Sequence, residues 1–199
     1  MDNKEKKLAA LHAPFTSMTN NPFVIAGSSR MVFGEGPATA RAMIIGEAPG
    51  RDEDIQGRPF VGRSGKLLTK ALESNGLSRQ DIYITNIVKT RPPNNRTPSK
   101  QEIETGRALL LKQIEIIDPA IICTLGACAL QGLNAPAIPT PIKITKIRGQ
   151  FFEYNKRILL PALHPSYILR NPSAIEVFVR DLLLLKQQIV TPTEQRATI

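Results

Sequence analysis

Four side chains capable of acid–base or hydrogen-bonding chemistry stand where short apolar runs of the sequence end. Glu47 and Glu53 share one loop, Asn86 lies at the end of a second apolar run, and His164 follows a later one. A carboxylate activates water or stabilises developing positive charge, an amide both donates and accepts, and an imidazole exchanges a proton. Taken singly, each residue has an ordinary structural explanation. Together they predict a polar ligand site at the ends of these runs.

The loops that carry or flank these residues are rich in glycine and proline. The sequences are GEAPG at residues 46–50, GRPFVG at 57–62, RPPNNR at 91–96 and HPSYILRNP at 164–172. Glycine and proline fix the shape of a backbone without adding bulk. Such loops suit close contact with a ligand.

The elements that position these loops alternate between strand and helix. Apolar runs predict strands at residues 42–45, 82–88, 120–125 and 158–163, and amphipathic patterns predict helices at 64–76, 99–117 and 173–189. Residues 144–154 are expected to pair with the fourth strand through a turn at Asn155. This alternation predicts one α/β domain with a parallel sheet and helices on both faces. Ligands of such folds bind beyond the carboxyl ends of the strands.

Composition limits the class of protein and of partner. Lys and Arg number 26 against 17 Asp and Glu in 199 residues, a net charge of +9 that favours a polyanionic partner such as nucleic acid. The most apolar stretch, residues 120–130, is shorter than the roughly 20 residues of a membrane span. Two cysteines exclude a disulfide framework. We expect a cytoplasmic protein, nucleoid-associated in a bacterium, with a mobile arm at 1–20, a single domain at 21–190 and a loose tail at 191–199.

Basic residues concentrate in three segments that border the predicted site. These segments are 59–70, 89–100 and 143–170. The first two contain no acidic residue, and the third contains only Glu153. Their basic residues are Arg63, Lys66, Lys70, Lys89, Arg91, Arg96, Lys100, Lys143, Lys146, Arg148, Lys156, Arg157 and Arg170. Loops of this charge around one cleft predict a track for phosphates.

The ordered set GEAPG, GRPFVG, TNIVK–RPPNNR and HPSYILRNP resembles the family 4 uracil-DNA glycosylases. The resemblance runs from about residue 32 to 185. It implies a three-layer αβα sandwich around a four-stranded, mainly parallel sheet. It also implies hydrolysis of the N-glycosidic bond of deoxyuridine in single- or double-stranded DNA, with the base flipped out of the stack. We expect a monomer that contacts no membrane and leaves an abasic site uncleaved.

The resemblance also implies roles for the site residues. Asn86 would read uracil O4 and N3–H, and His164 would donate to O2 and stabilise the departing anion. Glu47 and Glu53 would position the attacking water and stabilise the cationic sugar, with no division of these tasks between them. Phe60 would stack on the base, and the backbone of Gly46, Ala48 and Gly50 would surround it. The implied DNA contacts are Ser64, Lys66, Lys89, Arg91, Arg96, Ser166, Tyr167, Leu169 and Arg170, with Leu169 as a wedge and Arg170 on a phosphate.

One departure from the family concerns its cofactor. The resemblance implies a [4Fe–4S] cluster, which members of this family usually hold through four cysteines. The third and fourth of these cysteines correspond here to Thr90 and Gly106. Residues 16–30 contain no cysteine, and neither Cys123 nor Cys128 lies at a matching place. Because such clusters need thiolate ligands, we expect no cofactor and no metal.

Three other interpretations compete with this one. A nucleotide-binding P-loop at residues 60–67 fails because Phe60 replaces its first glycine and Leu67 its Ser or Thr. A glycosylase trapped covalently on the sugar is disfavoured, because residues 55–62 lack the altered loop and inserted histidine of such relatives. A catalytically weak DNA-binding or damage-sensing module on the same fold stays open, because the cluster cysteines are absent.

Overall fold

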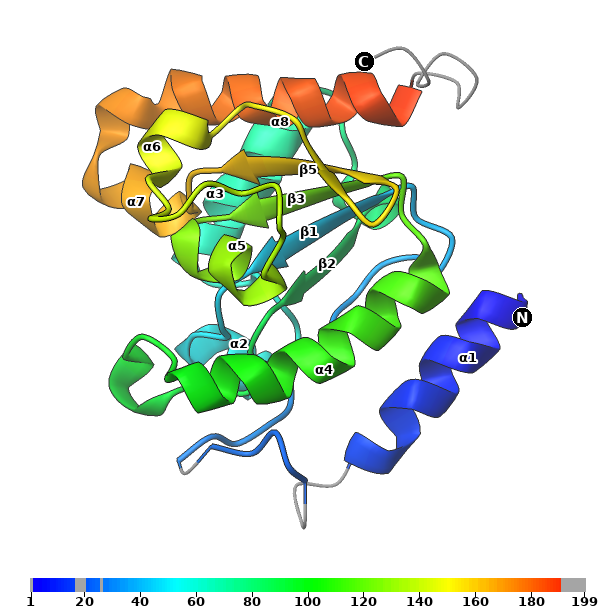
Figure 1. Ribbon diagram of the computed structural model, residues 1–199. Helices are drawn as coiled ribbons and strands as arrows, with labels where there is room; N and C mark the ends of the chain where they lie inside the picture. Colours follow the sequence, from blue (N-terminus) through cyan, green and yellow to red (C-terminus); the bar gives the residue numbers. More distant parts are fainter. Residues whose placement is uncertain (1, 17–20, 26, 191–199) are drawn as a thin grey trace.

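The protein folds around a five-stranded sheet. The computed structural model describes residues 2–16, 21–25 and 27–190 (Figure 1). The strand order is β2-β1-β3-β5-β4. The four parallel strands are β1 Ala42–Gly46, β2 Tyr83–Asn86, β3 Ile121–Leu125 and β5 Arg157–Ala162, and β4 Phe152–Tyr154 runs antiparallel to β5. This confirms the predicted α/β class and adds one strand to the expected four.

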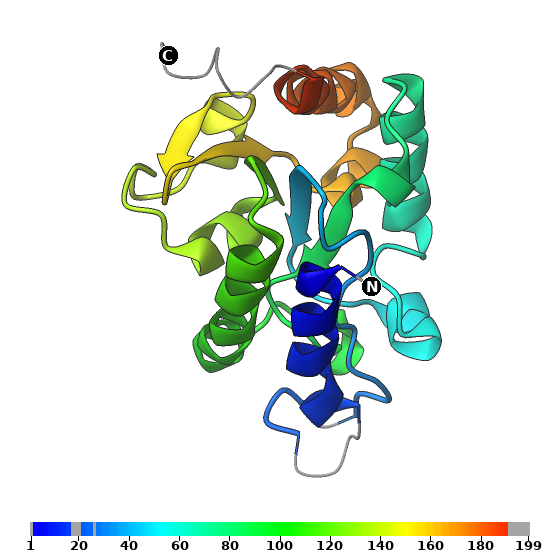
Figure 2. The same ribbon diagram turned by 90° about the vertical axis from the view of Figure 1, so that its right-hand side faces the viewer.

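Helices cover both faces of the sheet (Figures 1 and 2). α3 Arg63–Ser74 and α8 Ile175–Val190 pack on the face that carries Ile44 of β1. α4 Lys100–Ile117 and α5 Ala127–Leu133 pack on the face that carries Met43 and Ile45. Alternate residues of a strand point to opposite faces, so the continuous apolar runs of the sequence supply both cores.

The remaining elements are short. They are α2 Arg51–Gln56, α6 Ile144–Ile147, α7 Pro165–Arg170, and the 3-10 turns Ala13–Phe15, Arg79–Asp81, Pro93–Asn95 and Pro172–Ala174. α4 begins as the sequence predicts. The Ser99 hydroxyl accepts from the Glu102 amide at 3.3 Å, and the Glu102 carboxylate accepts from the Ser99 amide at 2.7 Å.

The segment before β5 differs from the expected hairpin strand. Residues 144–147 form α6 rather than strand, and only Phe152–Tyr154 pairs with β5. Gly149, at a φ of 72°, turns the chain between them, and its amide donates to the Pro161 carbonyl at 2.8 Å. Positive φ values at Asn155 and Lys156 confirm the predicted turn there.

The described part of the amino-terminal segment, where a mobile arm is expected, contains a helix. α1, Asn3–His12, lies along α4 (Figures 1 and 2). The His12 ring stacks on Phe33 at 4.3 Å between centroids, and the Lys4 ammonium donates to the Ile117 carbonyl at 2.7 Å. The expected tail at 191–199 lies outside the described residues. None of the described helices combines the length and apolar character that crossing a membrane requires.

Candidate active site

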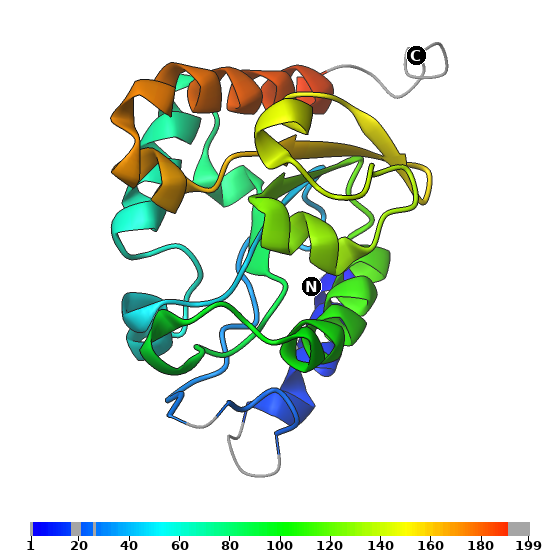
Figure 3. The ribbon, with the colours of Figure 1, turned by 60° about the vertical axis from the view of Figure 1, so that its left-hand side comes forward.

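The predicted site residues gather in one cavity at the carboxyl edge of the sheet. Figure 3 shows α2, α5 and α7 around this edge. The cavity has a volume of about 770 Å³. The predicted residues that line it are Glu47, Ala48, Gly50, Glu53, Phe60, Ser64, Asn86, Arg96, His164, Ser166, Tyr167 and Arg170.

Asn86 ends β2 directly beside Gly46, its parallel partner on β1. The Asn86 side chain is buried, and its Oδ1 atom has no hydrogen-bond partner among the described residues. A Cβ atom on Gly46 would lie 2.4 Å from Asn86 Oδ1 and 2.4 Å from Phe60 Cζ. The missing side chain of Gly46 therefore allows the Asn86 amide and the Phe60 ring to approach each other, and we call the part of the cavity that these two side chains border the base slot.

Phe60 is held in an unusual backbone conformation beside the slot. Its φ is 52°, and its ring centroid lies 6.0 Å from that of His164. The Phe60 carbonyl accepts from Arg79 Nη1 at 2.6 Å, and Arg79 Nη2 also donates to the Pro59 carbonyl. Glu35 in turn pairs with Arg79, with Nε to Oε1 at 2.7 Å. A left-handed conformation costs a non-glycine residue about 1–3 kcal/mol, so these contacts stabilise the loop.

Neither Arg79 nor Glu35 was identified as functional from the sequence. Arg79 contacts the Pro59 and Phe60 carbonyls, Glu35 and the Thr69 hydroxyl, and Glu35 also pairs with Arg58 at 2.8 Å, so most of these partners are distant along the chain. No local motif marks such contacts. Through these contacts Arg79, itself paired with Glu35, holds the backbone at Pro59 and Phe60.

Glu53 uses both of its carboxylate oxygens to hold loops together. Oε1 accepts from the amides of Val61 at 2.9 Å and Gly62 at 2.8 Å, and Oε2 accepts from the amide of Gly50 at 3.1 Å. A carboxylate with three backbone partners is fixed in position. Glu53 thus lines the cavity and joins the start of α2 to the loop before α3.

Glu47 is the carboxylate with more freedom to act on a ligand. It is only partly buried, and burial raises the pKa of its carboxyl, while a hydrogen bond with the Cys128 thiol acts in the opposite direction. Burial and the neighbouring Glu47 raise the pKa of Cys128 to about 12, so Cys128 stays a thiol. No sequence motif marks Cys128 as a residue of the site.

His164 caps α7 and presents a defined tautomer. Its Nδ1 accepts from the Ser166 amide at 3.1 Å and lies 2.8 Å from Ser166 Oγ. Burial, with a smaller contribution from Arg170, lowers the pKa of His164 to about 4. The ring is therefore neutral near pH 7, and because Nδ1 accepts, its proton sits on Nε2. His164 can donate a hydrogen bond from Nε2 without carrying charge.

The predicted DNA contacts divide into three groups. Ser64, Arg96, Ser166, Tyr167 and Arg170 line the cavity. Outside the cavity lining, Lys66 and Leu169 are exposed on α3 and α7, and Arg91 Nε donates to Asn95 Oδ1 at 2.7 Å.

Lys89 forms the third group, and its prediction as a DNA contact is wrong. Its side chain is 1% exposed. The ammonium group donates to the Thr85 hydroxyl, the Asn86 carbonyl and the Gln113 side chain. A buried ammonium with these partners cannot reach a phosphate.

The two positions that correspond to cluster ligands do not fit a cluster. The Thr90 hydroxyl donates to the Phe23 carbonyl, and a hydroxyl does not replace a thiolate. A Cβ on Gly106 would lie 2.1 Å from the Ile87 carbonyl oxygen, so no side chain fits there. Across the described ranges, no three His, Cys, Asp or Glu side chains are grouped to hold a metal ion.

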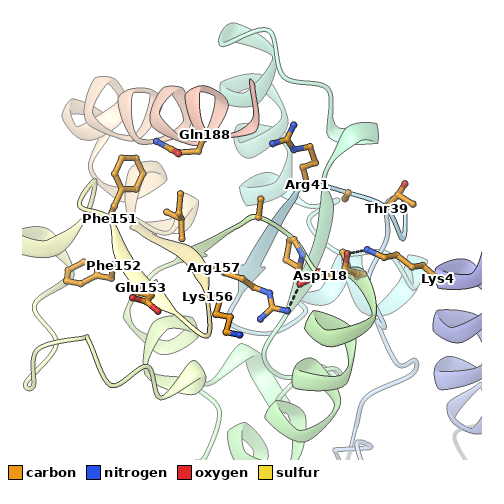
Figure 4. A pocket seen from close by; sticks show the side chains of 15 residues that line it. Lys4, Thr39, Arg41, Asp118, Phe151, Phe152, Glu153, Lys156, Arg157 and Gln188 are labelled. Carbon is orange, nitrogen blue, oxygen red and sulfur yellow. Dashed lines mark hydrogen bonds and ion pairs between the residues drawn. The ribbon is translucent and has the colours of Figure 1, made fainter. Parts of the chain in front are cut away.

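A second cavity, of about 800 Å³, lies at the opposite edge of the sheet (Figure 4). Its charged groups include Arg157, which pairs with Asp118 at 2.6 Å, and Lys4, which donates to a backbone carbonyl. None of the predicted site residues lines it. Because ligands of parallel α/β sheets bind at the carboxyl edge, the base-slot cavity is the better candidate.

Comparisons with known proteins show the family of this chain. A family model described as the uracil DNA glycosylase superfamily matches residues 33–184. The type-4 uracil-DNA glycosylase of Thermotoga maritima is 47% identical over 146 residues, covering 73% of this chain and 74% of that protein. The enzyme of the same name from Saccharolobus solfataricus is 45% identical, and the match covers 78% of this chain and 74% of that protein. The one from Archaeoglobus fulgidus is 41% identical, and the match covers 74% of this chain and 76% of that protein.

Proposed function

Because the chain belongs to the uracil DNA glycosylase superfamily, we propose that it hydrolyses the N-glycosidic bond of deoxyuridine in DNA. The products are free uracil and an abasic site. The observation that carries this proposal is the buried Oδ1 of Asn86, which has no hydrogen-bond partner among the described residues and belongs to a side chain that lines the cavity beside the Phe60 ring. A buried acceptor without a partner costs free energy, and a donor from the ligand would satisfy it.

The amide of Asn86 is the group that would select uracil. Its Oδ1 would accept from N3–H and its Nδ2 would donate to O4. Cytosine has an amine in place of O4 and no proton on N3, so both contacts would be lost. A site with buried polar groups rejects such a mismatch strongly. Phe60 would stack on the flipped base, a contact worth roughly 1–3 kcal/mol.

His164 would stabilise the leaving group. As the glycosidic bond breaks, negative charge develops on the uracil ring and its O2. The Nε2–H of the neutral imidazole would donate to that oxygen, and a placed donor of this type contributes roughly 10²–10³ in rate. Because the ring remains neutral, it would stabilise the anion without needing to transfer its proton.

Glu47 would act on the sugar and the water. The sugar takes on positive charge as uracil leaves, and a carboxylate at the cavity wall stabilises that charge and orients the attacking water. Glu53, committed to three backbone amides, would hold the loop that shapes the cavity. No lysine lies among the residues that line it. We therefore expect hydrolysis without cleavage of the DNA strand.

The proposal extends to cofactor and partners. With a threonine and a sterically closed glycine at two ligand positions, we propose an enzyme that needs neither an iron–sulfur cluster nor a metal ion. The partner would be uracil-containing DNA, approached by the exposed Lys66, Leu169 and Arg170. We expect a monomer that works in the compartment that holds the DNA.

The experiment is excision from a labelled oligonucleotide that carries one uracil. It would be run in chelator, with matched thymine and cytosine oligonucleotides, and abasic sites would be revealed by hot alkali. Alkali-dependent cleavage at uracil alone supports the proposal. Binding without uracil release would favour the damage-sensing alternative. Iron and sulfide content, with absorbance near 400 nm, tests the cluster statement separately.

A further inference from the structure

A fully buried lysine, Lys89, contacts the backbone of Asn86. Lys89 Nζ lies 2.7 Å from each of three oxygens: Thr85 Oγ1, the Asn86 carbonyl and Gln113 Oε1. Thr85 and Asn86 belong to β2, and Gln113 belongs to α4. The lysine therefore connects the end of the strand that carries the base reader to the helix behind it.

All three oxygens act as acceptors. The Thr85 hydroxyl already donates to the Phe33 carbonyl at 2.9 Å. The Gln113 amide nitrogen donates to the same carbonyl at 2.9 Å and to the Tyr83 hydroxyl at 3.1 Å, which turns its oxygen toward Lys89. Burial lowers the pKa of Lys89, whereas the three acceptors favour its charged form. The acceptor set matches the three N–H donors of an ammonium group.

The placement of the Asn86 side chain depends on its backbone. Oδ1 has no hydrogen-bond partner among the described residues, so no hydrogen bond within the described structure orients that atom directly. The main chain beyond it is bonded on one side to β1 and its loop, with Ile87 N to Gly46 O at 2.9 Å and Val88 N to Glu47 O at 3.0 Å. On the other side, the Asn86 carbonyl is held by Lys89. We propose that Lys89 is a positioning residue that holds the Asn86 amide in register with the uracil base.

This inference rests on the proposed function and predicts a particular pattern of losses. Replacing Lys89 by methionine keeps most of the volume but removes the tie between Asn86 and Gln113. A displacement of about 1 Å in a reacting group costs on the order of 10²-fold in rate. We expect K89M to slow single-turnover uracil excision by about 10- to 100-fold. Affinity for the same oligonucleotide should change little, because Lys89 does not reach DNA.

The test is a double-mutant cycle of K89M and N86A, measured by single-turnover excision. If Lys89 acts through Asn86, adding K89M to the wild-type protein will lower the excision rate about 10- to 100-fold. Adding K89M to the N86A variant will lower the rate by less than about threefold, because the effects of coupled residues are non-additive. Multiplicative losses in the cycle would overturn the proposal. Melting curves for all variants, with rates taken well below each transition, separate positioning from loss of fold.

A matched control removes a different contact of the same ammonium. T85V deletes the Thr85 acceptor and leaves the Asn86 contact in place, so its rate should stay within about threefold of wild type. Equal rate losses in T85V and K89M would contradict the assignment. If K89M does not fold, Q113L cuts the same tie from α4 and should show the same non-additivity with N86A. A wild type that excises no uracil would refute the proposed function and this inference together, whereas additivity in an active enzyme refutes this inference alone.

Discussion

The neutrality of His164 is a quantitative prediction that acidification tests. Burial lowers the pKa of this residue from 6.5 to about 4. At pH 5.5 a pKa of about 4 leaves roughly thirty neutral rings for each charged one, whereas a pKa of 6.5 would leave roughly one neutral ring for ten charged. The hydrogen bond that Nδ1 accepts from the Ser166 amide requires the neutral ring.

Proton NMR of the two histidine rings measures this directly. The chain has only His12 and His164, so an H12N variant leaves the His164 signal alone. We expect no titration of that signal between pH 7 and 5. Replacing Arg170 with glutamine should raise the pKa slightly and leave it below 6.5, because burial is the larger cause. A midpoint near 6.5 in the wild type would refute the argument for a neutral donor.

The lowered pKa of His164 also predicts how the free energy of unfolding responds to pH. The unfolded chain binds a proton at the ordinary histidine pKa of 6.5, while the folded protein resists it until about pH 4. This contribution to stability is complete above pH 6.5 and is lost as the pH falls towards 4. This contribution to the free energy of unfolding is at most about 3 kcal/mol, because a difference of one in pKa corresponds to about 1.36 kcal/mol. Chemical denaturation of wild type and H164Q at pH 7 and 5 should show a smaller loss in the variant.

Three further predictions concern the carboxylates, the Phe60 loop and the DNA surface. Glu47→Gln should slow single-turnover excision by at least tenfold with little change in melting temperature. Glu53→Gln should instead lower the melting temperature by several degrees, and the reverse pattern would contradict the roles assigned to these two carboxylates. Arg79→Met should weaken both folding and excision, and combination with Phe60→Ala should be less than additive in rate if Arg79 acts through Phe60. Lys66→Gln should reduce the salt dependence of DNA binding by about one unit of slope; an unchanged slope would remove Lys66 from the interface.

Much of the site follows from the order of the elements along the chain. Glu47, Asn86 and His164 come after three parallel strands, and the carboxyl ends of parallel strands share one edge of a sheet. The order of the strands along the chain is therefore enough to predict that these three residues lie close together. The capping box of α4 was equally visible, because it is local.

The parts that the sequence did not reveal depend on contacts between distant segments. Lys89 stands in a basic stretch that is typical of a surface, and its burial depends on Gln113, which comes from another element. Glu53 carries an acidic side chain suited to catalysis, but its three amide partners are backbone groups without a sequence signature. α1 is rich in lysine with a weak apolar pattern, so its packing on α4 could not be anticipated.

The most direct test of uracil recognition compares N86A with wild type on one uracil-containing oligonucleotide. Single-turnover excision and equilibrium binding are measured under the same conditions, with melting curves as the control for folding. The arrangement of the base slot predicts a rate loss of about 10³-fold with DNA affinity within about threefold, because the amide acts on the base as it leaves. An unchanged rate, or equal losses in rate and in binding, would contradict the role of Asn86 as the group that reads uracil.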